Sequence, residues 1–302
     1  MKWIKILLII VCCIFLSVCE KRWKTERESI QISETISGAG FQIKLRQQQG
    51  ILYSDPEKIV VDMAYAMLPT EKENSCFWRD YEELTQEQRV EFWKALIILS
   101  RTNLYKAWID AEFPEKLEFP VDKLAITKEI SGKETKDALS AQEKTQGIII
   151  CFDTEVKYLP YFFLSAGETR AGKICKDDKE NDSYVTLEKK SKEEFLEELQ
   201  ENFAVSTMEF EWKRDNAMYV EEIEMQGMVL NVSEFQKIFQ LPSPCFFVEE
   251  QGNQILFTTK GIGHGYGMSV NYALKLAKCG RSEEEILRYF FENIQLERKY
   301  GV

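Results

Sequence analysis

The chain's one histidine, His264, lies in a segment in which glycine occupies every second position from Gly261 to Gly267. If this segment is extended, the glycines share one side, where another backbone or a sugar ring can approach closely. His264 and Tyr266 then face the other side. Ser269 can cap a following helix, and a glycine-rich loop that enters a helix can bind an anion. The alternative is a glycine-rich hairpin packed under a helix, with His264 as a structural hydrogen-bond donor.

Composition excludes several classes of function. The chain has 302 residues, and 39 Lys and Arg stand against 50 Asp and Glu, which gives a formal net charge of −11. This balance argues against a nucleic-acid partner, because phosphate binding needs a basic excess. With a single histidine and no CxxC pair, we expect no metal site and no cofactor. We assign no disulfide among the cysteines that follow the first nineteen residues, which are Cys76, Cys151, Cys175, Cys245 and Cys279.

The N-terminus carries a targeting signal. Lys2 and Lys5 precede an apolar run that extends to Cys19, a pattern typical of a signal peptide or a short anchor. Three alternatives remain open: an uncleaved membrane anchor, which we favour, a lipoprotein linked through Cys19, and a cleaved signal. All three place the remainder outside the cytoplasm, at the cell membrane. We therefore divide the chain into an anchor (1–19), a polar stalk (20–39) and one folded domain (40–302).

Helix signals are spread along this domain. Pro56 opens a helix that ends before Pro69, and a charged loop follows over 70–84. Capping boxes predict three further helices, with the pairs Thr85 and Gln88, Ser191 and Glu194, and Ser282 and Glu285. A helical apolar pattern over 273–277 precedes the last of them. The segment 110–145 is predicted to form loops and short strands.

Strand signals alternate with these helices. Residues rich in β-branched and aromatic side chains predict strands over 147–152, 158–164, 217–226, 228–232, 246–250 and 255–259. Helices and strands are partly segregated along the chain. We therefore predict an α+β fold, with a largely antiparallel sheet and flanking helices after the N-terminal membrane anchor.

Four segments together resemble the stage II sporulation protein D family. Residues 263–269 read Gly-His-Gly-Tyr-Gly-Met-Ser, where the family typically has Gly-His-Gly-Val-Gly-Met-Ser-Gln. Residues 282–291 resemble its C-terminal Glu-Ile-Leu-x-Tyr-Tyr helix. Residues 161–169 resemble its Ser-Gly-Gly-x-Thr loop, and 95–105 its Ala-x-x-Ala-Arg-Thr-Tyr helix end. The order of the segments matches over roughly 40–298, and an N-terminal membrane anchor also fits.

The resemblance implies a sporulation cell-wall protein, a lytic transglycosylase that acts on peptidoglycan glycan strands stripped of their stem peptides. In such an enzyme one carboxylic acid protonates the glycosidic oxygen and then, as the carboxylate, helps the muramic 6-hydroxyl to close an anhydro ring. Implied partners are the glycan strands, the membrane and other sporulation or engulfment proteins. Substrate contacts are expected at Arg101, Thr102, Ser165, Gly167, Thr169, Arg170, Gly263, His264, Gly265, Gly267 and Ser269. For Arg101 and Thr102 the alternative is a structural hydrogen bond between the helix end and the sheet.

The sequence departs from the family at the catalytic position. The family's catalytic Glu lies in a Val-Val-x-x-Glu-Met-Pro segment, and alignment on Pro69 places Met67 at that Glu. Met67 cannot transfer a proton. The candidate acids that remain nearby or in a matching loop are Glu71, Glu73 and Glu168.

Two interpretations follow from this departure. The chain is either a divergent transglycosylase with a replacement acid, or a glycan-binding or scaffold protein that has lost catalysis. In both cases a cleft for muramic acid needs local positive charge, because the negative net charge of the chain repels the carboxylate of that sugar. Arg101, Arg170 and Lys173 are the donors expected for the lactyl carboxylate.

Overall fold

The computed structural model describes residues 42–47, 50–54, 56–70, 75–112, 114, 116–119 and 133–299. The predicted anchor and stalk lie outside these residues, as do Glu71 and Glu73. Within the described part no helix is both long enough and apolar enough to cross a bilayer.

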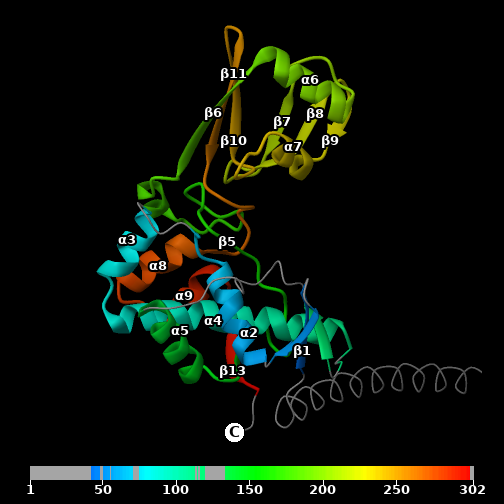
Figure 1. Ribbon diagram of the computed structural model, residues 1–302. Helices are drawn as coiled ribbons and strands as arrows, with labels where there is room; N and C mark the ends of the chain where they lie inside the picture. The colour runs from blue at the N-terminus through cyan, green and yellow to red at the C-terminus, as the bar shows by residue number, and fades with distance from the viewer. Residues whose placement is uncertain are drawn as a thin grey trace, which may run out of the picture.

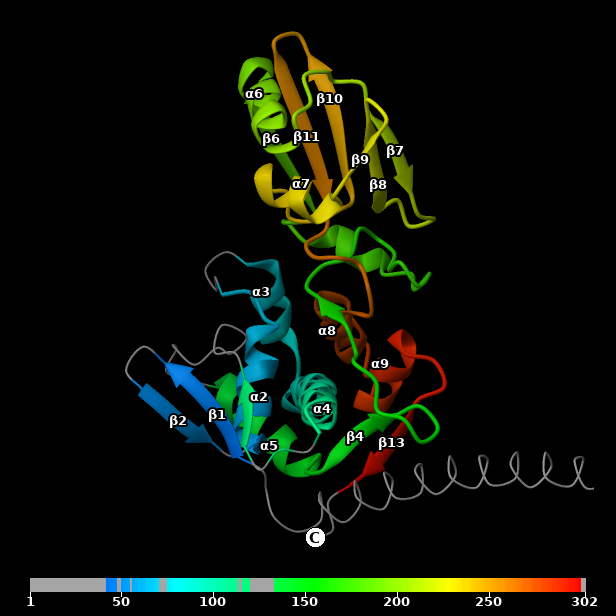
Figure 2. The ribbon, with the colours of Figure 1, turned by 90° about the vertical axis from the view of Figure 1, so that its right-hand side faces the viewer.

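A long central helix, α4 (Gln86–Asp110), organises the lower half of the molecule. It begins at the predicted capping box, in which Thr85 accepts from the backbone of Gln88 and the Gln88 side chain accepts in return. Most of its residues from Val90 to Trp108 are buried, so it is covered on nearly every side. Figure 2 looks along α4 and shows its neighbours around it. These are α2 (Pro56–Ala66), α5 (Lys133–Lys144), α8 (Val270–Lys278), α9 (Glu283–Phe290) and β4 (Ile148–Cys151).

Small sheets border this helical body. β1 (Gln42–Gln47) pairs antiparallel with β2 (Gly50–Ser54) and parallel with β3 (Lys116–Phe119). β4 pairs antiparallel with β13 (Gln295–Arg298). α3 (Cys76–Glu83) stands beside α8 at the upper end of the body (Figure 1).

A mostly irregular layer lies above α8. It contains β5 (Tyr161–Phe162), the short 3-10 helix η2 (Lys176–Glu180) and β12 (Met268–Ser269). β5 and β12 pair in parallel, with Met268 opposite Tyr161. This pair joins the loop at Ser165 to the glycine segment around His264, although about a hundred residues separate them in sequence.

The upper part of the molecule is a β-rich unit formed by one continuous stretch of chain (Figure 1). One sheet has the order β10 (Phe246–Gln251), β11 (Gln254–Lys260), β6 (Val185–Ser191), and another has β7 (Glu211–Arg214), β8 (Val220–Met225), β9 (Met228–Leu230). α6 (Lys192–Phe203) and α7 (Val232–Ile238) pack with them. Val185 pairs with Lys260, so the chain enters and leaves this unit side by side.

Two separate hydrophobic clusters result. The larger one gathers around α4 and includes Phe92, Trp93 and Leu274. The smaller one lies wholly within the upper unit, where Phe235 stacks on Phe246 at 5.5 Å and contacts Phe239 at 4.5 Å. Two clusters with no shared members indicate that each part is stabilised by its own core.

The predicted mixed α+β class is confirmed, but the strands of the described residues form five small sheets rather than one largely antiparallel sheet. Most strands are short and are separated by helices, and two of the strand pairs are parallel. The prediction of a loop over 70–84 was wrong for α3, and that of loops and strands over 110–145 was wrong for α5. Of the predicted strand over 158–164, only two residues form a strand, and most of the remainder is irregular backbone.

Candidate functional site

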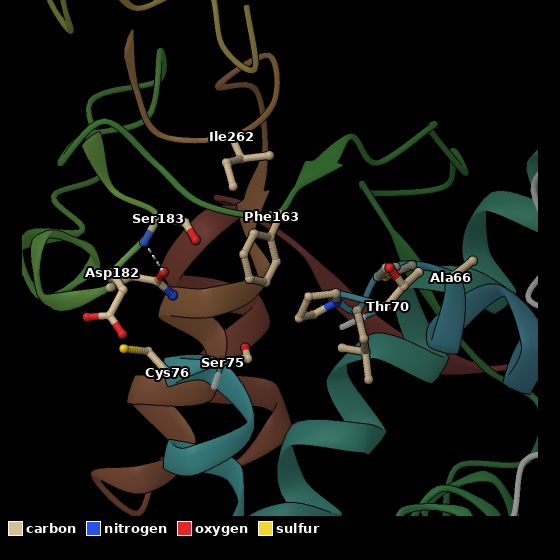
Figure 3. Close-up of a pocket in the computed structure, with 12 residues that line it drawn as sticks. Ala66, Thr70, Ser75, Cys76, Phe163, Asp182, Ser183 and Ile262 are labelled. Atoms are coloured by element: carbon tan, nitrogen blue, oxygen red, sulfur yellow. Dashed lines mark hydrogen bonds between the residues drawn. The ribbon is translucent and has the colours of Figure 1, made fainter. Parts of the chain in front are cut away.

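A cleft of about 720 Å³ separates the end of α2 and the start of α3 from the irregular layer above them. Figure 3 shows Ala66 and Thr70 on one side, Ser75 and Cys76 below, and Phe163, Asp182, Ser183 and Ile262 on the other walls. Three of the segments identified in the sequence thus meet at one cavity: the chain before Pro69, the segment before Ser165, and the start of the glycine segment.

Met67 lines this cleft at the position expected for a catalytic glutamate. The chain turns there because the amides of Met67 and Leu68 donate to Ala64 and Tyr65, and Pro69 cannot extend the helix. The indole of Trp78 in α3 donates to the Pro69 carbonyl at 3.2 Å and fixes this turn. The Met67 side chain is only 5 % exposed, so it contributes an apolar wall and no acid.

Asp182 is the one carboxylate among the described residues that line the cleft. Its side chain is largely exposed and forms a 3.4 Å ion pair with Arg79. The same Arg79 nitrogen lies 2.7 Å from the sulfur of Cys76. A guanidinium therefore stands at the rim of the cleft between two of its lining residues.

Glu168, the described member of the three predicted acids, lies away from this cleft. It is half-buried in the loop that follows Ser165, where its carbonyl accepts from the Tyr219 hydroxyl at 3.3 Å. It is not among the residues that line the cavity. Glu71 and Glu73 lie outside the described residues.

The loop at Ser165 is held by a buried carboxylate, Asp178. Its oxygens accept from the Ser165 amide at 2.9 Å, the Ser269 hydroxyl at 2.8 Å and the Asn271 amide at 2.8 Å. Burial raises the pKa of Asp178, while these donors act in the opposite direction. Asp178 thereby joins the Ser165 loop to the N-terminus of α8. Ser165 and Ser269 are themselves fully buried, so their polar atoms serve this connection.

Thr169 and Gly167 form hydrogen bonds within the same loop. Thr169 is fully buried, and its hydroxyl accepts from the Lys173 amide at 3.1 Å. The Gly167 amide donates to the Ser165 hydroxyl at 3.1 Å. Both residues therefore stabilise the turn rather than line the cleft.

The alternating glycines pack against protein. A Cβ on Gly267 would lie 1.9 Å from the Pro160 carbonyl oxygen, and one on Gly263 would lie 2.6 Å from the Phe162 Cβ. Gly265 faces the ring of Tyr219 in the same way. All of these glycines have positive φ, so the segment is not a regular extended strand. The close approach that was expected occurs, but a neighbouring backbone and side chains occupy it.

His264 lies on the opposite, exposed side of this segment. Its Nδ1 accepts from the Tyr266 amide at 3.0 Å, so the neutral ring carries its proton on Nε2. Partial desolvation by neighbouring atoms, and then the charge of Arg170, lower the pKa of His264. The ring is therefore neutral at pH 7. With Tyr266, Arg170 and Glu221 it lines a second cavity of about 370 Å³.

Arg101 and Thr102 lie inside the helical body. The Arg101 guanidinium is fully buried and forms two hydrogen bonds to Glu57, at 2.8 and 2.7 Å. The Thr102 hydroxyl donates to the Ile98 carbonyl and accepts from the Ile150 amide, which connects α4 to β4. Both side chains thus bond within the protein, and neither lines the cleft.

Arg170 and Lys173 also have protein partners. Arg170 donates to Asp215, to the His264 carbonyl and to the Val220 carbonyl, so it joins the upper unit to the glycine segment. Lys173 pairs with Glu292 at 2.5 Å. The cation that stands at the cleft is instead Arg79, which the sequence did not single out.

Sequence reasoning missed Arg79, Asp182 and Asp178 for one reason. All three lie in stretches rich in both charges, and such stretches look like solvated surface. A signal for α3 was present, since Phe77, Trp78, Tyr81 and Leu84 have helical spacing, and all four are buried. For η2, which carries Asp178, the sequence offers no comparable pattern. Among the described residues no cluster of three His, Cys, Asp or Glu side chains is placed to hold a metal ion.

Comparison with known proteins gives a distant similarity over about half of the chain. The stage II sporulation protein D of Bacillus amyloliquefaciens is 26 % identical over 175 residues, which is 53 % of this chain and 51 % of that protein. The stage II sporulation protein D of Bacillus subtilis is 32 % identical over 72 residues, 24 % of this chain and 21 % of that protein. The chain thus aligns with at most about half the length of these relatives. No family model matches the chain.

Proposed function

We propose that this chain is a sporulation cell-wall protein that binds peptidoglycan glycan strands in the cleft beneath Phe163 and does not cleave them. The observation that carries this proposal is the buried Met67 in the cleft wall, at the position where a transglycosylase of the similar family has its acid. The cleft is still lined by the neighbouring loops but has no proton donor at the Met67 position, so it is suited to binding a ligand without cleaving it.

The chemistry of the cleft wall supports a sugar ligand. Phe163, Ile262 and Met67 provide apolar surface for the C–H face of a pyranose ring. Thr70, Ser75 and Ser183 provide hydroxyls around that surface, and Asn181 adds an amide. A cavity that combines apolar surface with a few polar groups at fixed positions is the usual form of a small-ligand site.

The location and further partners are part of the same proposal. The apolar N-terminal run anchors the chain in the cell membrane, with the described domain outside the cytoplasm, where glycan strands are accessible. Other sporulation or engulfment proteins are the partners expected there. Alkaline extraction of membranes tests the anchor, because an anchored chain remains in the pellet.

The proposal is tested with the full chain in detergent and peptide-free glycan strands immobilised on a sensor. We expect the native chain to bind and mass spectrometry to detect no anhydro-muramyl products. Ser183→Trp fills the cleft from an exposed lining position and should lower affinity at least about tenfold. Ser233→Trp, an exposed serine that lines the second cavity, is the matched control and should bind like the native chain. No binding by the native chain, or equal binding by both variants, would contradict the proposal.

A second candidate is a transglycosylase that uses Asp182 as its acid, favoured by the presence of that carboxylate in the cleft. Asp182 would protonate the glycosidic oxygen as the C1–O bond breaks, and would then accept the proton of the 6-hydroxyl as that oxygen bonds to C1. To do so it must leave its ion pair with Arg79. Anhydro-muramyl products from the native chain that vanish in Asp182→Asn would establish this candidate instead.

A further inference from the structure

We propose that Arg79 binds a carboxylate of the ligand in the cleft and makes the site selective for acid-bearing glycan over neutral glycan. This inference rests on the proposed function and assigns one residue to its selectivity. Arg79 belongs to α3, in a segment outside the motifs that carry the family resemblance, so its role is argued from the contacts of this structure alone.

The Arg79 guanidinium contacts two residues of the cleft wall. One guanidinium nitrogen, Nη2, lies 2.7 Å from the Cys76 sulfur and 3.4 Å from a carboxylate oxygen of Asp182. Cys76 and Asp182 both line the cleft, and Figure 3 shows the Cys76 sulfur and the Asp182 carboxylate close together on one wall. The charge therefore lies next to two residues that line the cleft.

Arg79 is also accessible, unlike the other cations that the sequence suggested. Its side chain is 66 % exposed, whereas that of Arg101 is fully buried against Glu57. Arg170 has three protein acceptors, and Lys173 is paired with Glu292. An exposed ion pair such as that of Arg79 with Asp182 contributes little, so a ligand carboxylate can replace it with two parallel hydrogen bonds.

The helix that carries Arg79 is held firmly. Phe77 packs edge-on against Phe163, which lines the cleft, with ring centroids 5.6 Å apart. On the opposite side Asp80 accepts from Lys275 and from Lys278, at 2.8 Å each. A guanidinium on a fixed helix selects the position of its partner as well as its charge.

The overall charge gives this residue its effect on selectivity. With a formal charge of −11, the chain repels an anionic ligand in general. Asp182 adds a negative charge at the cleft itself. A ligand carboxylate is therefore accepted only where Arg79 can contact it, whereas a neutral ligand gains nothing from this contact.

The test compares two probes on the full chain in detergent. One probe is a peptide-free oligosaccharide of alternating N-acetylglucosamine and N-acetylmuramic acid; the other is the same oligosaccharide with its lactyl carboxylates converted to methylamides. We expect the native chain to prefer the acid by at least about tenfold, as for loss of a bidentate charged contact. Arg79→Ala should abolish this preference by weakening binding of the acid alone, and Arg79→Lys should restore part of it.

Arg281→Ala is the matched control, since it removes an exposed arginine that pairs with Glu285 and leaves the same net charge as Arg79→Ala. It should keep the native preference. Equal affinity of the native chain for both probes would overturn this inference while the proposed function stands. So would an equal loss of affinity for both probes in Arg79→Ala. Failure of the native chain to bind either probe would overturn the proposed function itself.

Discussion

Glu91 of α4 and Glu283 at the start of α9 share one site in the helical body. The Glu91 carboxylate accepts from the Glu283 amide at 3.0 Å, and Lys94 contacts both side chains, at 2.7 and 3.6 Å. Desolvation raises the pKa of Glu283 to about 7, and its hydrogen bond with Glu91 acts in the same direction. The pKa of Glu91 is lowered to about 2 by its hydrogen bonds with Glu283 and Lys94, which outweigh desolvation. The pair therefore keeps one proton over a pH range in which free glutamates have lost both.

This pair makes stability depend on pH. The pKa of Glu283 rises from an ordinary 4.5 to about 7, so the folded chain holds a proton that the unfolded chain has released between those values. The free energy of unfolding then falls as pH rises through that window, by about 1–2 kcal/mol after allowance for partial exposure. Glu283→Gln cannot titrate, so its Tm should fall less between pH 5 and 7 than that of the native chain.

Thermal unfolding across this range provides the measurement. Glu284→Gln, in the same first turn and half-exposed beside Arg288, is the control and should retain the native slope. Parallel slopes for native chain and Glu283→Gln would mean that Glu283 does not titrate in this window.

At the scale of elements, the glycine segment is a packed connector between β11 and α8. Its glycines combine positive φ with contacts that leave no room for a Cβ. Gly267 is the most restricted, because the added atom would meet the Pro160 carbonyl, which itself accepts from the Met268 amide. The spacing of glycine thus reflects the need for close approach to residues 160–166 more than contact with a ligand.

Gly267→Ala should therefore destabilise the chain far more than an alanine at another left-handed glycine. Gly252, with φ +65 and no atom within 4 Å of an added Cβ, isolates the backbone cost alone, about 1 kcal/mol. Gly267, with φ +75, adds a backbone clash at 1.9 Å, and we expect a total loss above about 3 kcal/mol. Urea unfolding of the two variants measures the difference, and equal losses would exclude the close contact at Pro160.

The sequence predicted those elements whose signals are local. The three capping boxes are confirmed at α4, α6 and α9, because each depends on residues three positions apart. It failed for α5, a charged helix that buries small residues such as Ala138 and Ala141. It left open whether Arg101 has a structural role or contacts substrate, because the partner Glu57 lies far away in sequence. The cleft depends on such distant pairs, so its composition could not be derived from spacing.

At the scale of the whole molecule, residues 185–260 form an insertion between two loops of the layer above α8. Their hydrophobic cluster contains only residues of this stretch. Polar contacts attach this unit to the layer beneath it. They include Arg170 with Asp215 and the Tyr219 hydroxyl with the Ala166 amide. The paired ends at Val185 and Lys260 mean that removal of the unit leaves a gap which a short turn can close.

We therefore expect the isolated stretch 185–260 to fold without the rest of the chain. Its unfolding, followed by circular dichroism, should be one cooperative transition, because the aromatic cluster around Phe235 is complete within it. Phe235→Ala, which removes the centre of that cluster, should abolish the transition or lower its Tm sharply. If the isolated stretch with its native sequence shows no cooperative transition, its contacts with the layer above α8 are required for folding.

The entry and exit of this unit have a mechanical consequence. β6 and β11 run together from the layer above α8, and β11 rises by about 20 Å over its seven residues. Tyr184 and Gly261, joined by a 2.9 Å hydrogen bond, lie at the base of both strands. Gly252 lies at the far tip of the hairpin that β10 and β11 form. A force applied there acts as a torque on the base. From there it passes to Ile262 and to the neighbour of Phe163, Leu164, so a displacement of the hairpin tip would move two walls of the cleft together.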